Sequence, residues 1–331
     1  MVVELRFGIE LVPSSPISEL VNLSIHAENL GFNYVWITDH FNNRNVYVTL
    51  TSIALNSKKI MLGPGVTNPY VISPVWTASA VASLDEVSNG RAVLGIGAGD
   101  RATLEKISIE WKKPLATIRE SVEIIRKLLR GEVVTYSGEI FKVFGAALNY
   151  KPVHEIPIYI GAQAPKMLQL AALLGDGILI NASNPKDYEY AMNIIREGAK
   201  ERIGKLDIVA YTSFSIDRDR SVARKTVRPI VAFIVAGAPE EVLRRHGIDV
   251  EKAKEIGENI SKGRFKDAFS LVTDEMIDAF SISGTPTECI EVLNRLVKLG
   301  VTQIVFGSPI GKDKKSALEL IASDVVAHFK A

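Results

Sequence analysis

The chain has 331 residues, 47% of them hydrophobic and 23% charged, and its 39 basic and 38 acidic side chains give a formal net charge of +1. This balance argues against nucleic acid or an anionic membrane as a partner, because neither would meet a matching positive surface, and it favours a small molecule. The single cysteine, Cys289, excludes an intrachain disulfide and predicts a reducing, cytoplasmic location. Its helical spacing with Val292 and Leu296 predicts a buried structural thiol.

Short apolar runs alternate with amphipathic helices along the whole chain. Strands are expected at residues 5–11, 34–38, 60–67, 92–97, 158–161, 178–181, 208–216 and 303–307. Most of these runs are continuously apolar, which is typical of parallel strands that helices cover on both faces. The pattern therefore predicts a single (β/α)8 TIM barrel that spans residues 1–331 as one domain.

Two stretches depart from this rhythm, and a third could be mistaken for a membrane span. Residues 133–143, with Ser137-Gly138 at their centre, predict a β-hairpin inserted after the fourth strand. Residues 237–280 predict a charged helical segment between the seventh and eighth strands. Residues 60–84 carry no charge and are long enough to span a bilayer, but prolines interrupt them, so a buried strand, a loop and a buried helix are expected.

A doubly wound open sheet is the competing architecture. That fold would place a glycine-rich phosphate loop after its first strand, where this chain has Val12-Pro13-Ser14. The glycine cluster at residues 95–100 comes after the fourth strand and has Asp100 where the dinucleotide fingerprint G-x-G-x-x-G requires its last glycine. The sequence therefore disfavours a nicotinamide-binding fold.

In a (β/α)8 barrel the active site forms where the strands end. Ionisable, amide and small residues occupy these positions: Glu10; Asp39 and His40; Gly65, Val66, Thr67 and Asn68; Gly97, Ala98, Gly99 and Asp100; Gly161, Ala162 and Gln163; Asn181, Ala182 and Ser183. Small residues would let a flat ligand approach the backbone closely. Neither an H-E-x-x-H spacing nor a G-x-S-x-G motif occurs in the sequence, so no metal site and no nucleophile elbow are expected.

The same positions also have structural interpretations. Glu10 could pair with a Lys or Arg, because buried carboxylates are usually paired. Asp39 could cap the loop that follows it, and His40 could be a rim histidine with its hydrogen bonds satisfied. The glycines could serve only to form tight turns.

Several motifs resemble the bacterial-luciferase-like superfamily: WITDHF at residues 36–41, LGPGVTNP at 62–69, GIGAGD at 95–100, YSGEIF at 136–141 and PIYIGA at 157–162. Four others closely resemble the methylenetetrahydromethanopterin reductases of methanogenic archaea: FGIE at 7–10, GPGVTNPY at 63–70, NASNP at 181–185 and GSPIG at 307–311. The resemblance covers essentially the whole chain. It implies an oxidoreductase of methanogenesis that uses coenzyme F420 to interconvert the methylene and methyl forms of tetrahydromethanopterin.

The resemblance also implies how the cofactor is held. The strand-end residues named above from Asp39 to Ser183, apart from Asp100, are expected to bind F420, and the superfamily's cis bond between non-proline residues is expected at Gly65-Val66. The anionic tail of the cofactor is expected at the helix starts near Pro165 and Pro185. Lys225 and Arg228 are candidate counter-charges for that tail. A homo-oligomer, a dimer or a tetramer, is also expected.

Reduction of the methylene form needs a proton on the departing ring nitrogen in addition to the hydride that a deazaflavin carries. A carboxylic acid in an apolar pocket suits this task, because desolvation raises its pKa. Glu10 is therefore the expected acid, and Asp100 is expected to orient it, bind the pterin or share the proton. Glu120 is a third candidate, with a surface ion pair to Arg119 or Lys127 as its structural interpretation.

Two rival functions stay open. Another F420- or flavin-dependent dehydrogenase or monooxygenase of the same superfamily would keep the barrel and change the substrate. A non-enzymatic barrel that only binds a flavin would not need an acid at the position of Glu10.

Overall fold

The computed structural model describes residues 4–330, and the chain divides into two compact units. The first, here called the barrel unit, comprises Arg6–Asn181 and Ala191–Val209. The second, here called the helical unit, contains Ala182–Tyr190 and the chain from Ala210 onward. Neither unit is one continuous segment, because the chain passes from one to the other more than once.

The barrel unit holds a run of short parallel strands. They are β1 (Arg6–Leu11), β2 (Tyr34–Ile37), β3 (Met61–Pro64), β4 (Leu94–Ile96), β7 (Ile158–Gly161) and β8 (Gly177–Ile180). Each pairs with the next in chain order, with β3 and β4 joined by the parallel bridges Leu62–Ala92 and Thr67–Ile96. The strands are almost entirely buried, which explains their continuously apolar sequences.

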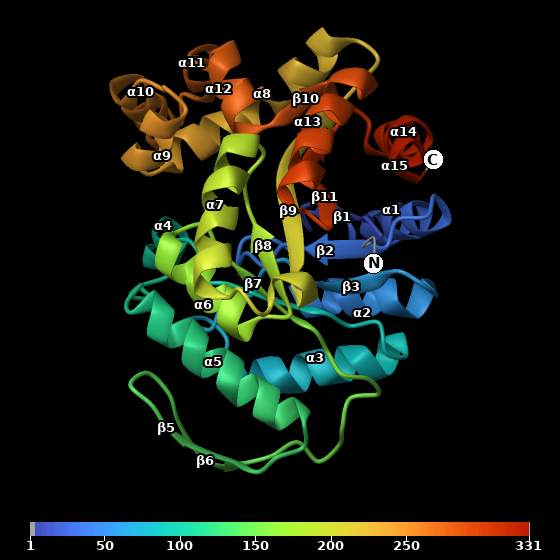
Figure 1. Ribbon diagram of the computed structural model, residues 1–331, viewed down its shortest axis with the longest axis vertical. Coiled ribbons are helices and arrows are strands. Elements are labelled where there is room, and N and C mark those ends of the chain that lie inside the picture. The colour runs from blue at the N-terminus through green and yellow to red at the C-terminus, as the bar shows by residue number, and fades with distance from the viewer. Residues whose placement is uncertain (1–3, 331) are drawn as a thin grey trace. The chain divides into compact units, whose positions relative to one another are not determined.

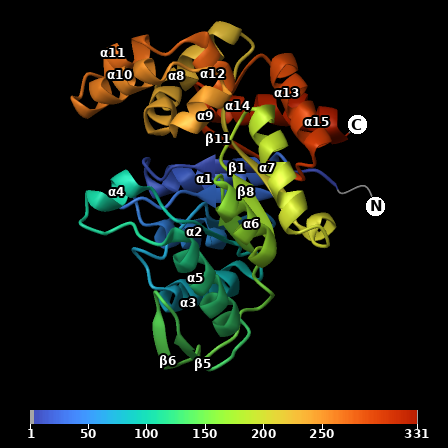
Figure 2. The same cartoon turned by 60° about the vertical axis from the view of Figure 1, so that its left-hand side comes forward.

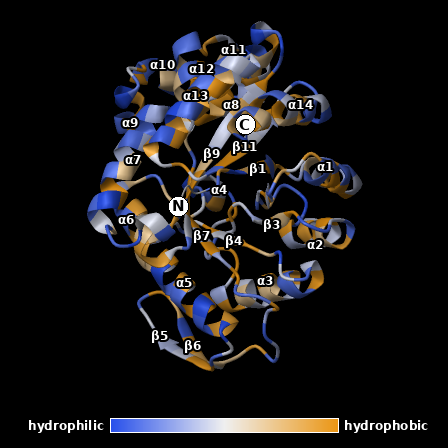
Figure 3. Cartoon of the chain, turned by 45° about the vertical axis from the view of Figure 1, so that its right-hand side comes forward, coloured by the Kyte–Doolittle hydropathy of each residue, from blue (hydrophilic) through white to orange (hydrophobic). Residues whose placement is uncertain are grey.

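Helices separate these strands. They are α1 (Ile17–Asn29), α2 (Val46–Asn56), α3 (Pro74–Ser88), α4 (Arg101–Glu105), α5 (Pro114–Leu129), α6 (Pro165–Leu174) and α7 (Pro185–Gly198), with a 3-10 turn at Ile203–Lys205. Proline opens α3, α5 and α6, at the position where a missing N–H costs no hydrogen bond. In Figure 1, α2, α3 and α5 follow one another around the outside of the strands. Figure 3 shows blue and orange residues together on α5, whose apolar side chains are buried.

Two further strands complete the parallel set. β9 (Asp207–Ile216) begins in the barrel unit, where the Asp207 N–H donates to the Asp176 carbonyl over 3.1 Å. In the helical unit it neighbours β11 (Gln303–Ile310), and Thr212 Oγ1 donates to the Val305 carbonyl over 3.0 Å. The eight parallel strands with helices between them form the (β/α)8 barrel fold, which confirms the predicted fold class.

The uncharged stretch at residues 60–84 folds as expected. It forms β3, a loop and most of α3. Among the described residues, no helix is both long and apolar enough to span a bilayer.

The predicted hairpin is present as β5 (Val134–Ser137) and β6 (Lys142–Ala146), which pair antiparallel. Figure 2 shows it below α3 and α5. Its turn is held by Glu120 of α5, whose carboxylate accepts the N–H groups of Glu139 (2.7 Å), Ile140 (3.0 Å) and Phe141 (2.9 Å).

This arrangement corrects the predicted role of Glu120. The side chain is only 6% exposed, so the interpretation as a surface ion-pair partner of Arg119 or Lys127 is wrong. A Cβ on Gly138 would lie 2.3 Å from Glu120 Oε2, so the turn needs glycine there to bring its N–H groups to the carboxylate. Both carboxylate oxygens are engaged by the hairpin, which leaves Glu120 a structural residue.

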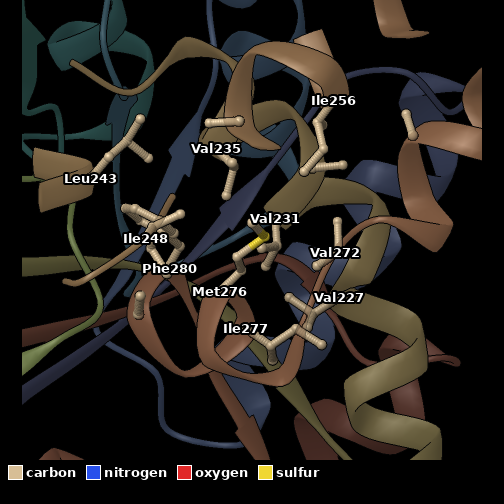
Figure 4. Packing of buried hydrophobic residues seen from close by; sticks show 14 residues of the cluster. Val227, Val231, Val235, Leu243, Ile248, Ile256, Val272, Met276, Ile277 and Phe280 are labelled. Atoms are coloured by element: carbon tan, nitrogen blue, oxygen red, sulfur yellow. The ribbon is translucent and has the colours of Figure 1, made fainter. Parts of the chain in front are cut away.

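The helical unit contains its own apolar core. Its helices are α8 (Arg220–Gly237), α9 (Glu240–Arg245), α10 (Val250–Ser261), α11 (Phe265–Ser270), α12 (Asp274–Phe280), α13 (Pro286–Leu299), α14 (Lys314–Leu320) and α15 (Ala327–Lys330), with a π-helical turn at Ile321–Val326 and the short strand β10 (Ile282–Gly284). Figure 4 shows Val231 and Val235 of α8 gathered with Met276 and Ile277 of α12. The helical segment begins earlier than predicted, at the start of α8.

Cys289 lies in α13 and is 1% exposed. Burial raises the pKa of its thiol to about 12, so almost none of the nucleophilic thiolate is present near neutral pH. The prediction of a buried structural thiol is confirmed.

Candidate active site

The carboxyl ends of the parallel strands in the barrel unit lie at one edge of the sheet, and the predicted site residues of that unit, up to Asn181, stand at or after these ends. Glu10 is the penultimate residue of β1 and is paired with Trp36 of β2. Its side chain is 6% exposed, between Ile9 and Leu11, which are completely buried. A buried acidic group costs free energy unless it is paired or protonated, so the role of Glu10 as the acid stays a prediction beside the structural, paired interpretation.

Asp39 follows β2 and is hydrogen-bonded to Thr67, which follows β3. Thr67 Oγ1 donates to Asp39 Oδ2 over 2.7 Å. Burial raises the pKa of Asp39, and the bond from Thr67 and the nearby His40 partly oppose that rise. Asp39 thus joins two strand ends instead of capping its own loop. His40 is exposed.

Tyr47, in the first turn of α2, was not predicted as a site residue. Burial and the neighbouring Asp39 charge raise the pKa of its phenol. The hydroxyl lies close to Thr67 but makes no hydrogen bond of good geometry with any described residue, and the buried Thr38 Oγ1 also lacks a partner there. Buried polar groups are normally paired, so two unpartnered ones at this edge mark a place where a ligand's polar atoms can bind. Nothing in the local sequence distinguishes Tyr47 from any other aromatic residue at a helix start.

Val66 forms the apolar surface of this edge. The Gly65-Val66 peptide bond is cis, as predicted. A Cβ on Gly97 would lie 2.7 Å from Val66 Cγ2, and one on Gly161 would lie 3.5 Å from Cγ1. The side chain of Val66 therefore lies over both glycines. These glycines make room for Val66, and a flat ligand at this edge would meet Val66 first.

The loop after β4 is fixed by contacts of its own. Trp111 Nε1 donates to the Ala98 carbonyl over 2.8 Å, and Gly99 adopts a positive φ of 69° beside the Asn68 side chain. Asp100 is exposed and caps α4, with its Oδ2 accepting the Thr103 N–H over 2.8 Å. Its catalytic role stays a prediction beside this structural one.

The ends of β7 and β8 are linked through Gln163, whose amide Nε2 donates to the Asn181 carbonyl. In the helical unit, Ser183 Oγ accepts the Ser213 N–H over 3.0 Å. The predicted tail site at the start of α7 is partly used by the chain itself, because the Lys186 N–H donates to Asn184 Oδ1 over 3.0 Å. The start of α6 has no side-chain cap.

Lys225 and Arg228 line a cleft of the helical unit together with Arg220, Arg224 and Asp274. Arg228 is partly engaged, since it donates to the Val272 carbonyl over 2.6 Å. In the part of the chain that the structure describes, no three His, Cys, Asp or Glu side chains are arranged to hold a metal ion.

Comparisons with known proteins agree with this architecture. The model of the family described as luciferase-like monooxygenase matches residues 1–303. The 5,10-methylenetetrahydromethanopterin reductase of Archaeoglobus fulgidus is 55% identical over 334 residues, covering 98% of this chain and 100% of that protein. The solved coenzyme F420 dependent tetrahydromethanopterin reductase of Methanopyrus kandleri superposes with a TM-score of 0.94 at 45% identity, covering 98% of this chain and 99% of that one. An F420-dependent secondary alcohol dehydrogenase, solved with an F420-acetone adduct, shares the fold at a TM-score of 0.81 and 21% identity, covering 98% of this chain and 99% of that one.

Proposed function

This chain belongs to the luciferase-like family, and we propose that it is an F420-dependent 5,10-methylenetetrahydromethanopterin reductase. The observation that carries the proposal is the 55% identity to such a reductase over essentially the full length of both chains. The matched region covers 98% of this chain, so it includes the strand ends together with the scaffold that positions them.

The residues at the carboxyl edge of the barrel unit fit a deazaflavin. Val66 offers an apolar surface for one face of a flat ring. Among the described residues, the buried hydroxyls of Tyr47 and Thr38 have no hydrogen-bond partner of good geometry, so they would be available to polar atoms at a ring edge. Asp39 and Thr67 hold each other and so keep the ends of β2 and β3 fixed beneath the ring.

In the proposed reaction, the protein orients the cofactor and the substrate and supplies one proton. When bound, F420 supplies a hydride to the one-carbon unit of the substrate. Glu10 would give its carboxylic proton to the pterin ring nitrogen as the bond from that nitrogen to the bridging carbon breaks, and would be left as a carboxylate. The burial of Glu10 would limit competition from water for that proton, and Val66 would support one face of the deazaflavin ring.

Cofactor binding tests this assignment against the flavin-dependent alternatives. Titration under anaerobic conditions, followed by fluorescence quenching, should give a dissociation constant for reduced F420 in the micromolar range or tighter, which is about −8 kcal/mol or more favourable. FMN in a parallel titration is the control. Tight binding of FMN without binding of F420 would overturn the cofactor assignment.

The proposal includes assembly into a homo-oligomer, a dimer or a tetramer, in the cytoplasm. Neighbouring helices α2 and α3 support assembly, because Leu55 and Trp76 on them are 70% and 71% exposed. Trp76→Glu should shift the mass measured by light scattering toward the monomer. An unchanged mass would remove this face from the proposal.

The single, buried cysteine supports the proposed reducing compartment, the cytoplasm.

A further inference from the structure

A buried tyrosine holds the turn that follows β8. Tyr188 lies in the first turn of α7 and is completely buried. Its hydroxyl donates to the Ala182 carbonyl over 2.8 Å, across the turn that joins β8 to α7. A carbonyl fixed in this way cannot rotate without breaking a buried hydrogen bond.

Both residues after Ala182 are held as well. Ser183 Oγ accepts the Ser213 N–H of β9 over 3.0 Å. Asn184 donates from Nδ2 to the Asp278 carbonyl of α12 over 3.0 Å, and its Oδ1 accepts the Lys186 N–H. Three consecutive residues of the turn are thus fixed by three different elements of the helical unit.

The helix that carries Tyr188 is itself fixed. Asp187 accepts from Arg245 over 2.8 Å and lies 3.0 Å from His246 Nε2, which anchors the start of α7 to the end of α9. The Arg245 guanidinium also lies 4.0 Å from the centre of the Tyr190 ring. Tyr188 is therefore part of a helix start that is anchored to the end of α9.

We propose that Tyr188 is a positioning residue that sets the conformation of the turn at residues 181–184 and thereby the affinity for F420. The inference rests on the proposed function, since it takes Asn181, Ala182 and Ser183 as part of the cofactor site. Within the helical unit, the Tyr188 hydroxyl thus fixes the part of the turn that begins at Ala182. Tyr188 acts through the turn and takes no part in the chemistry, so it should change cofactor affinity and leave turnover at saturating cofactor unchanged.

Tyr188→Phe removes only the hydroxyl and tests this directly. A single intramolecular hydrogen bond contributes about 0.5–1.5 kcal/mol, so the dissociation constant for F420 should rise by about three- to ten-fold, with unchanged kcat. Hydrogen exchange at the amides of residues 182–184 in the free protein should become faster. Tyr150→Phe is the control, because it also removes a hydroxyl that donates to a backbone carbonyl, that of Ser79 over 2.9 Å, and that is bonded in addition to Ser83 Oγ over 2.7 Å. It should lower the melting temperature similarly and leave F420 affinity unchanged.

Asn184→Ser provides a second variant, since serine keeps a capping oxygen but loses the donor to Asp278, and it should weaken F420 binding in the same way. If wild type binds F420 and both variants bind it equally well despite lower melting temperatures, the positioning role is refuted and the proposed function stands. If wild type does not bind F420, the proposed function fails and the positioning role for cofactor fails with it.

Discussion

Buried polar side chains determine what the carboxyl edge of the barrel unit can do. Glu10 brings a carboxyl group to a position that is 6% exposed, and Asp39 and Thr67 satisfy each other across two strand ends. The hydroxyl of Tyr47 has no protein partner of good geometry among the described residues. Polar groups are costly to bury, and Glu10, Asp39 and Thr67 stand at or just after strand ends, where barrel enzymes carry their chemistry.

At the scale of single residues, Glu10→Gln tests whether Glu10 is the general acid. Glutamine keeps the size and the hydrogen-bonding capacity of the side chain but has no acidic proton, so kcat should fall by ~10²–10⁴, the range typical of general acid catalysis. The dissociation constant for F420 should stay the same, because Glu10 is assigned to the pterin. Stopped-flow turnover and fluorescence titration on one preparation measure both.

Asp100→Asn is the comparison for that experiment. Asp100 is exposed and caps α4, and asparagine is also a good cap, so the fold should be preserved and the loss of kcat should be smaller. Near-normal turnover in Glu10→Gln with a lowered melting temperature would make Glu10 a structural residue.

At the scale of elements, the β5–β6 hairpin depends on one side chain of α5. Glu120→Ala would leave three backbone N–H groups of the turn without acceptors, which should destabilise the hairpin by about 1–3 kcal/mol. The hairpin should then exchange amide hydrogens faster and be cleaved sooner by a protease, while kcat stays near normal. Glu123→Ala is the control, because Glu123 lies on the same helix and accepts only the Tyr136 hydroxyl, over 2.8 Å, among its described contacts. A large loss of kcat in folded Glu120→Ala would restore Glu120 as a candidate acid.

The elements themselves were largely predictable because their signals are local. Continuously apolar runs located the barrel strands, and Ser137-Gly138 located the hairpin turn. β3 and β4 are shorter than predicted because the pairing between them consists only of the isolated bridges Leu62–Ala92 and Thr67–Ile96. The start of α8 was missed although Ala223, Val227 and Val231 form a buried stripe at helical spacing, because basic residues are interspersed with that stripe in the first turns.

The partners of individual side chains were not predictable. Glu120 binds the hairpin turn about 20 residues away, and Trp111 and Tyr188 bind backbone carbonyls, which have no sequence signature. These contacts exist only once the elements pack. The sequence could therefore locate the candidate site at the strand ends but could not show which residues hold those ends in place.

At the scale of the whole molecule, the two units are interleaved in sequence. The chain leaves the barrel unit after Asn181 and returns at Ala191, and α7 and β9 each have residues in both units. Within the barrel unit, Arg6 at the start of β1 pairs with Asp207 at the start of β9 over 2.8 Å, so the returning segment is bound to the first strand. No single cut in the polypeptide chain would therefore separate the barrel unit from the helical unit.

We therefore expect one cooperative unfolding transition for the full chain, in keeping with a single domain. Differential scanning calorimetry should show one peak, with equal calorimetric and van't Hoff enthalpies per cooperative unit. Near-ultraviolet and far-ultraviolet circular dichroism should give the same midpoint. Two resolved peaks would instead mean that the barrel unit and the helical unit are separate domains.

The most direct test of the reductase assignment is to mix the protein with reduced F420 and methylenetetrahydromethanopterin in the absence of oxygen. The absorbance spectrum of F420 then reports its oxidation. The wild-type chain should oxidise F420 only when the pterin is present, with one methyl product formed per cofactor oxidised. Catalytic amounts of the protein should suffice. Equal rates with and without the pterin, or no oxidation in a preparation that binds F420, would contradict the assignment.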